Sequence, residues 1–88
     1  MRNDFSVGQK YGLNRTGIEV VATMLPVSKN RSSFGYLTRE DGEVRCYEIL
    51  DGSVSPTSMN LNIRTSREFP LDESQEDVAD KILERAGL

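Results

Sequence analysis

Three aromatic side chains that share one side of a predicted β-hairpin could stack on nucleotide bases. They are Phe34, Tyr36 and Tyr47, and between them Asp41-Gly42 favours a tight two-residue turn. With that turn, Tyr36 faces Tyr47, and Phe34 points to the same side because side chains alternate along a strand. A base stacked on an aromatic ring contributes about 1–3 kcal/mol to binding, whichever base it is. The same rings could equally form the core of a small domain, and the sequence leaves both interpretations open.

Basic residues lie on and beside this hairpin, where they could hold the phosphates of a nucleic acid. The candidates are Lys29, Arg31, Arg39, Arg45 and Arg64. Phosphate binding needs positive charge together with hydroxyl or amide donors, and Ser32 and Ser33 follow Arg31 directly. Side-chain alternation places Arg45 on the aromatic side of the hairpin and Arg39 on the other side. The candidate binding site therefore comprises the three aromatic residues and these five cations.

The residues around the hairpin also match a known pattern. The match consists of Gly17-Ile18-Glu19-Val20, Ser33-Phe34-Gly35-Tyr36-Leu37 and Arg39-Glu40-Asp41-Gly42. Together these segments resemble the first half of a cold-shock domain, over roughly residues 17–51. The resemblance implies an OB barrel that binds single-stranded RNA or DNA, with Phe34 and Tyr36 stacking on bases and Gly35 letting a base approach. Ser32-Ser33 stands where that family has Lys-Gly, and Ala22-Thr23-Met24 where it has Trp-Phe.

The composition argues against catalysis and against metal binding. The chain contains no histidine, which excludes Ser-His-Asp and Cys-His catalysis and most transition-metal sites. Its one cysteine, Cys46, shares the side of Leu37 and Val44, which predicts a buried and unreactive thiol. The acidic residues near the C-terminus suit a helix dipole and lack the spacing of a calcium loop. We therefore expect no enzyme activity, no catalytic residue, no metal and no cofactor.

Charge is distributed unevenly along the 88 residues. Residues 1–67 hold nine Lys or Arg against seven Asp or Glu, whereas residues 68–88 hold two against seven. A net charge of −3 is unusual for a dedicated nucleic-acid-binding domain. The alternative function is therefore a small regulator or inhibitor that acts by protein–protein contact, through the acidic segment, a strand edge or the aromatic face. Self-association into a homodimer is a third hypothesis.

The elements that position these residues are mostly strands of one domain, residues 1–88. Residues 1–16 predict an arm or short strand, and residues 17–67 predict a β-barrel body. The segment Gly17–Leu25 is rich in β-branched residues, which predicts a strand, and this strand is expected to end at Pro26. The polar segments Ser28–Ser33 and Asp51–Thr57 predict loops.

Met59–Ser66 alternates in polarity, which predicts a half-buried strand. Its inward residues are expected to be Met59, Leu61 and Ile63, and its outward residues Asn60, Asn62, Arg64 and Ser66.

The C-terminal segment predicts the single helix of the chain, over residues 74–86. Ser74 is the expected N-cap, with Asp77 completing a capping box. An apolar stripe at helical spacing comprises Val78, Ala79, Ile82, Leu83 and Ala86. A helix this short is marginal alone, so the stripe is expected to pack on the barrel. The predicted fold class is mainly β: a small antiparallel barrel of four or five strands, OB-like or SH3-like, with a C-terminal helix. With no targeting or membrane-spanning segment in view, we expect a cytoplasmic location and no membrane partner.

Overall fold

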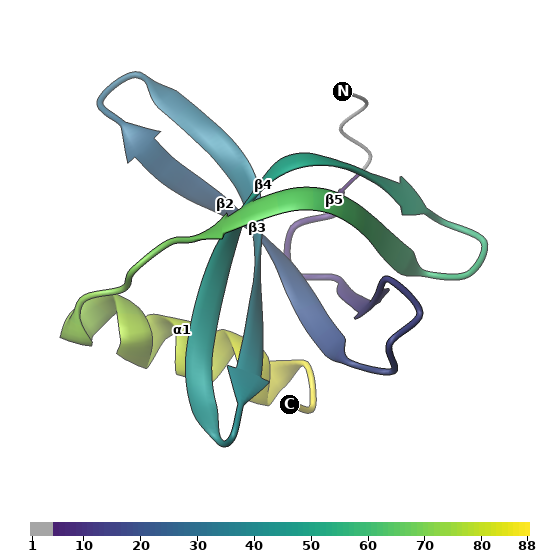
Figure 1. Cartoon of the computed structure of the whole chain (residues 1–88). Helices are drawn as coiled ribbons and strands as arrows, with labels where there is room; N and C mark the ends of the chain where they lie inside the picture. Colours follow the sequence, from purple (N-terminus) through teal and green to yellow (C-terminus); the bar gives the residue numbers. More distant parts are fainter. Residues whose placement is uncertain (1–4) are drawn as a thin grey trace.

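The computed structural model describes residues 5–88 and contains five strands and one helix (Figure 1). The strands are β1 (Lys10–Leu13), β2 (Glu19–Ser28), β3 (Arg31–Glu40), β4 (Glu43–Ser55) and β5 (Asn60–Glu68). The helix, α1 (Glu73–Arg85), follows the last strand. The predicted fold class, a small β-barrel with a C-terminal helix, is confirmed.

The barrel is closed, and its strands follow one another around it in sequence order. Each consecutive pair is antiparallel. The barrel closes where β1 pairs with β5 in parallel, with Gly12 opposite Asn60 and Leu13 opposite Leu61. This sequential order differs from the Greek-key order of an OB-fold.

The β3–β4 hairpin has the register that its sequence predicts. Tyr36 lies opposite Tyr47 and Leu37 lies opposite Cys46. The turn consists of Asp41 and Gly42, whose φ angles are 52° and 84°. A two-residue type I′ turn needs positive φ at both central positions, so this Asp-Gly pair sets the register.

The β2–β3 connection differs from the expected loop, because only Lys29 and Asn30 lie outside the strands. The prediction that Pro26 ends the strand is also wrong, since β2 continues to Ser28. The backbone N–H and C=O of Ala22 bond to the β1 side, to Gln9 and Gly8. Ala22 and Pro26 have the same backbone orientation because they are an even number of residues apart on the strand. An N–H at position 26 would therefore point away from β3, so a proline there, which has no N–H, removes no hydrogen bond to β3.

Residues 23–34 form a two-stranded arm, here called the ribbon. On one side, the last pairing of β2 with β1 joins Val21 to Lys10. On the other side, the pairing of β3 with β4 ends where Gly35 lies opposite Glu48. Beyond these points the two strands pair only with each other among the described residues. The ribbon therefore projects from the barrel, at the upper left of Figure 1.

The prediction of a loop over Asp51–Thr57 is wrong for most of these residues, because β4 runs to Ser55. The ladder shifts register around Asp51 and Gly52, which accommodates these turn-forming residues in a strand. A Cβ on Gly52 would lie 2.9 Å from the carbonyl oxygen of Asn62, so only glycine allows this close approach.

Two predictions about side-chain direction in the following strand are wrong. Met59 lies in the turn before β5 with a φ of 51° and is 39% exposed, although it was expected inside. Asn60, expected to face water, is buried, and its Oδ1 accepts a hydrogen bond from the backbone N–H of Arg15 at 3.4 Å. Leu61 is fully buried as expected.

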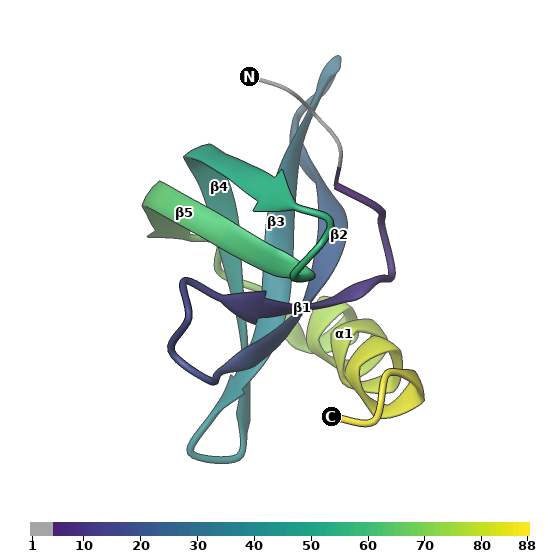
Figure 2. The ribbon, with the colours of Figure 1, turned by 90° about the vertical axis from the view of Figure 1, so that its right-hand side faces the viewer.

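Two apolar clusters lie on opposite faces of the sheet. The cluster inside the barrel comprises Phe5, Tyr11, Val20, Ala22, Tyr36, Ile49 and Leu61. The cluster under the helix comprises Val21, Leu25, Leu37, Cys46, Ala79 and Leu83. Helix α1 therefore packs on the outer face of the barrel, against β2, β3 and β4 (Figure 2).

The helix begins one residue earlier than predicted. Its N-cap is Asp72, whose side chain accepts a hydrogen bond from the backbone N–H of Gln75, and the Gln75 side chain accepts one from Asp72 in return. Ser74, the expected N-cap, instead donates its hydroxyl to Asp72 at 3.2 Å. In the described part of the chain, no helix has the length and apolar character needed to cross a membrane.

Candidate nucleic-acid interface

The aromatic side of the β3–β4 hairpin faces the barrel interior. Tyr36 is 6% exposed and belongs to the interior cluster. Its ring stacks on Tyr47 with centroids 5.2 Å apart. Burial is the main reason why the pKa of Tyr36 is raised. Tyr36 is therefore a core residue in this structure, and its ring is not available to a base.

The other two aromatic residues lie at the margin of the interior cluster and are half-buried. Phe34 packs against Phe5, with ring centroids 5.1 Å apart. The hydroxyl of Tyr47 donates to Oε2 of Glu40 at 2.8 Å, and this bond raises the pKa of Tyr47 to about 12. Both rings thus have partners inside the domain, and Phe34 lies in the part of β3 that belongs to the ribbon.

Gly35 was expected to let a base approach the backbone, but the space beside its Cα is already filled. The side chain of Leu25 occupies it from the neighbouring strand. The glycine therefore serves packing between β2 and β3.

Three of the five candidate cations pair with carboxylates of the same domain, and two of these, Arg39 and Arg45, do so closely. Arg39 forms an ion pair with Asp80 on α1 at 2.7 Å, and its Nε–H donates to the carbonyl oxygen of Leu88 at 2.6 Å. Arg45 pairs with Glu43 at 3.0 Å and more loosely with Glu40 at 3.7 Å. Arg39 thus links α1 to β3, and Arg45 forms its contacts within the β3–β4 hairpin.

Arg64 lies on β5 with its side chain 82% exposed and is 3.8 Å from Asp51. It is not part of the ribbon, so the structure does not gather it with Lys29 and Arg31.

A charged pair that the sequence analysis did not single out lies on the outer face of the sheet. Arg67 donates to Oε1 of Glu48 at 2.8 Å, and the Glu48 side chain is only 8% exposed. The pKa of Glu48 is lowered, chiefly by this hydrogen bond, with smaller contributions from Ser33 and Arg31. Recognising the pair requires the β4–β5 register, in which Glu48 lies opposite Arg67.

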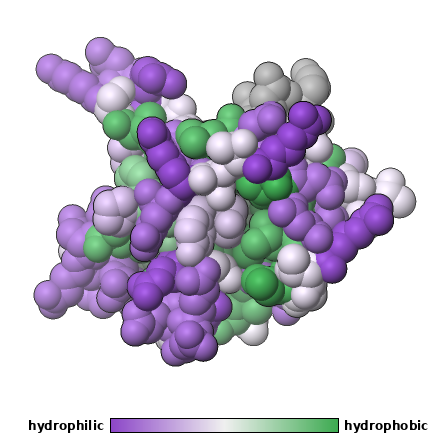
Figure 3. Space-filling model, viewed as in Figure 1, coloured by the Kyte–Doolittle hydropathy of each residue, from purple (hydrophilic) through white to green (hydrophobic). Residues whose placement is uncertain are grey.

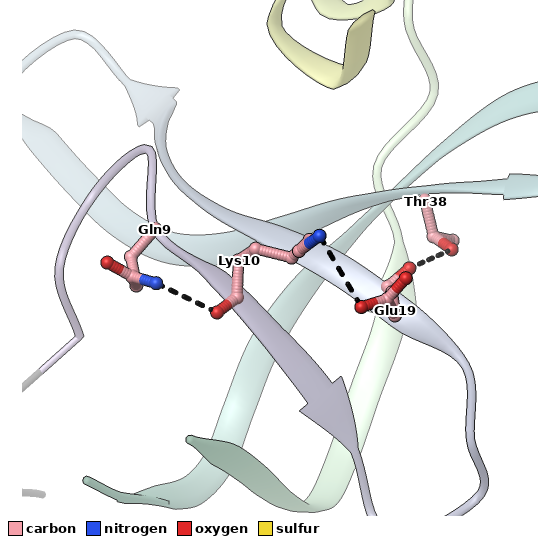
Figure 4. Close-up of polar contacts among 4 residues, drawn as sticks. All are labelled: Gln9, Lys10, Glu19 and Thr38. Carbon is pink, nitrogen blue, oxygen red and sulfur yellow. Dashed lines mark hydrogen bonds and ion pairs between the residues drawn. The ribbon is translucent and has the colours of Figure 1, made fainter. Parts of the chain in front are cut away.

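Another cation, Lys10, is engaged between β1 and β2 (Figure 4). Its Nζ lies 3.6 Å from Oε2 of Glu19, and its carbonyl oxygen accepts a hydrogen bond from Gln9 at 3.1 Å. The hydroxyl of Thr38 donates to the carbonyl oxygen of Glu19 at 3.2 Å. These contacts join β1, β2 and β3, so Lys10 is also a structural residue.

The ribbon carries the remaining two candidates at its tip. Lys29 and Arg31 are exposed, and neither forms an ion pair with another residue of the range 5–88. No Asp or Glu occurs between Glu19 and Glu40 in the sequence. The structure therefore brings together Lys29, Arg31 and Ser32 on an arm that carries no carboxylate of its own, and Glu48 of β4 lies near its base, where it interacts with Ser33 and Arg31.

An apolar groove lies between the ribbon and α1. Its volume is about 280 Å³, and its lining includes Leu25 and Pro26 from β2 and Ala79 and Ile82 from α1. Figure 3 shows it as an indentation on the left, between the ribbon above and the helix below. The groove is thus a second exposed feature, distinct in chemistry from the basic tip.

Comparisons of this chain with protein-family models, with curated proteins and with solved structures give no match.

Proposed function

We propose that this chain is a non-catalytic binding module that holds single-stranded RNA or DNA along its ribbon. The observation that carries the proposal is the projecting basic tip, where Lys29 and Arg31 are free of ion pairs within residues 5–88. Backbone phosphates supply most of the affinity in non-specific nucleic-acid binding, and they need such cations. The exposed hydroxyl of Ser32, next to Arg31, adds a hydrogen-bond donor for phosphate oxygens.

One apolar pair on the ribbon can support a base beside these phosphates. Met24 and Phe34 lie opposite each other across β2 and β3, and Met24 is 44% exposed. Side chains directly opposite in an antiparallel pair share a face, so the two form one apolar surface. The stacking role expected of three aromatic residues is reduced to Phe34 in this proposal, with Met24 beside it.

The proposal depends on the charge of the ribbon and not on kinship with cold-shock domains. The resembling segments cover the hairpin region, whereas the barrel around it has sequential strand order. Two cations that each neutralise one phosphate predict a shallow salt dependence, with log K falling by about 1.4 per tenfold rise in salt.

Fluorescence anisotropy of a labelled mixed-sequence single strand, titrated at low and at moderate salt, tests the proposal. The variant Lys29→Ala/Arg31→Ala is expected to lose most of the binding that the unchanged protein shows at low salt. The matched control is Lys81→Ala/Arg85→Ala, which removes the same charge from α1 and should bind like the unchanged protein. Equal losses in both variants, or no binding at low salt, would overturn the proposal.

A second candidate function is regulation or inhibition by contact with another protein, and the apolar groove favours it. Val78 on α1 lies at its margin and is 59% exposed. Protein-binding surfaces are typically apolar at their centre and polar at their rim. This candidate predicts that Val78→Asp abolishes partner binding while oligonucleotide binding stays unchanged.

A further inference from the structure

We infer that Arg67, held in place by the carboxylate of Glu48, is a third phosphate ligand for the single strand that the ribbon binds. This inference rests on the proposed function and extends the binding surface from the ribbon tip onto β5. It also assigns a role to Glu48, a buried charged residue that the binding of a strand at the tip leaves unused.

Arg67 is connected to the base of the ribbon by a row of residues across the sheet. Gly35 lies opposite Glu48, and Glu48 lies opposite Arg67. Neighbouring strands lie about 4.8 Å apart, so Arg67 is only two strand spacings from β3. Side chains alternate along β3, so Arg31 and Ser33 point to the same face as position 35. Arg31 and Arg67 therefore lie on the outer face of the sheet, with Glu48 on the strand between them.

The positive charges around Glu48 exceed its single negative charge. Its side chain is 8% exposed, and its Oε1 accepts a hydrogen bond from Nε of Arg67 at 2.8 Å. This bond is the main reason why the pKa of Glu48 is lowered, and Ser33 and Arg31 lower it further. Two arginines thus share one carboxylate, which leaves one positive charge in excess for a phosphate.

Arg67 is more open to solvent than the paired arginines of the hairpin. Its side chain is 67% exposed, against 26% for Arg39 and 37% for Arg45. The hydrogen bond to Glu48 uses one of the five N–H groups of the guanidinium. A guanidinium fork matches a phosphate, and a side chain that is already held loses less entropy when it binds. Glu48 is therefore a positioning residue that acts through Arg67.

The salt dependence of strand binding tests the role of Arg67. Two phosphate contacts predict that log K falls by about 1.4 per tenfold rise in salt, and a third contact raises this slope to about 2.1. In anisotropy titrations with a mixed-sequence single strand, Arg67→Ala is expected to return the slope to about 1.4 and to weaken binding about fivefold at 0.1 M salt. The matched control Arg64→Ala removes an exposed arginine from the same strand and should keep the slope of the unchanged protein. Equal slopes in the unchanged protein and Arg67→Ala, or equal losses in the two variants, would overturn the inference.

Two variants of Glu48 test whether its carboxylate positions Arg67. If the carboxylate only repelled the phosphates, Glu48→Ala would bind the strand more tightly than the unchanged protein does. We expect weaker binding, because Arg67 loses the partner that holds it. Glu48→Gln keeps an oxygen that can accept from Nε of Arg67, and it should bind at least as tightly as the unchanged protein. Tighter binding by Glu48→Ala would overturn the positioning role.

A measurement on the unchanged protein keeps the inference testable if circular dichroism shows a variant to be unfolded. The side-chain Nε–H signal of Arg67 in NMR spectra should shift when the strand is added, and that of Arg64 should not. An unmoved Arg67 signal, together with shifts at residues 28–34, would overturn this inference and leave the proposed function standing. An unchanged protein that binds no strand at low salt would overturn both.

Discussion

The side chain of Leu25 lies directly beside the Cα of Gly35. A Cβ added to Gly35 would lie 2.5 Å from Cδ1 of Leu25 and 2.5 Å from the carbonyl oxygen of Tyr47. Atoms cannot remain at such distances, so a larger residue would force β2, β3 and β4 apart. The glycine between two aromatic residues is thus explained by packing at the base of the ribbon.

Gly35→Ala is expected to destabilise the domain, because the added methyl group overlaps one side chain and one backbone oxygen. Overpacking of this kind typically costs about 1–3 kcal/mol. Urea unfolding followed by circular dichroism measures the change in the free energy of unfolding.

The double variant Gly35→Ala/Leu25→Ala tests the cause of that loss. Measured against Leu25→Ala alone, Gly35→Ala should cost less than it does in the unchanged protein, but still something, because the carbonyl oxygen of Tyr47 still opposes the methyl group. A Gly35→Ala protein as stable as the unchanged one would contradict this account of the glycine.

Tyr36→Ala is expected to lower the free energy of unfolding far more than Phe34→Ala does. Tyr36 is 6% exposed inside the barrel, whereas Phe34 is half-buried at its margin. Removing a large buried aromatic side chain costs about 3–5 kcal/mol. Thermal unfolding of the two variants gives the comparison, and a Tyr36→Ala protein with an unchanged melting temperature would show that this ring is not core.

Arg39→Ala is expected to weaken the packing of α1 on the barrel without unfolding the barrel. The substitution removes the ion pair with Asp80 and the hydrogen bond to Leu88. Partly exposed charged contacts are modest, so the expected loss is about 1–2 kcal/mol. Hydrogen exchange should speed up for the backbone amides of α1 and stay unchanged in β2, and equal acceleration in both would argue against this role.

The Cys46 thiol predicts a change of stability at alkaline pH. Burial raises its pKa from 9.0 to about 11. Because the folded value lies above the unfolded one, its contribution is complete below about pH 9 and is lost as pH rises through about 11. The difference in unfolding free energy between the unchanged protein and Cys46→Ala should therefore shrink over that range. A difference that stays constant from pH 8 to 11 would mean that the thiol is accessible to water.

Local sequence signals were sufficient where neighbouring residues alone determine the structure. Asp41-Gly42 set the turn and hence the register that joins Tyr36 to Tyr47. The apolar stripe around Ala79 and Leu83 predicted a helix that packs on the barrel. The N-cap was placed at Ser74 instead of Asp72, because both residue types accept the same hydrogen bond and only the fold selects one.

Long-range contacts explain what the sequence could not predict. The aromatic side of the hairpin became the interior because residues far away in sequence, such as Tyr11 and Leu61, close around it. Arg39 was a candidate phosphate ligand until the fold placed Asp80 beside it. Lys29 and Arg31 form no ion pair within residues 5–88 because β2 and β3 extend past the barrel, which depends on where β1 and β4 stop pairing.

The central claim is that the ribbon tip is the binding surface, and an NMR titration tests it most directly. Backbone amide signals of the isotopically labelled protein would be followed while a mixed-sequence single strand is added at low salt. We expect the largest chemical-shift changes at residues 28–34, with little change at Arg39, Arg45 and Arg64. As salt is raised, the shifted signals should move back toward their positions in the free protein. Shifts centred elsewhere, or none at all, would contradict the claim.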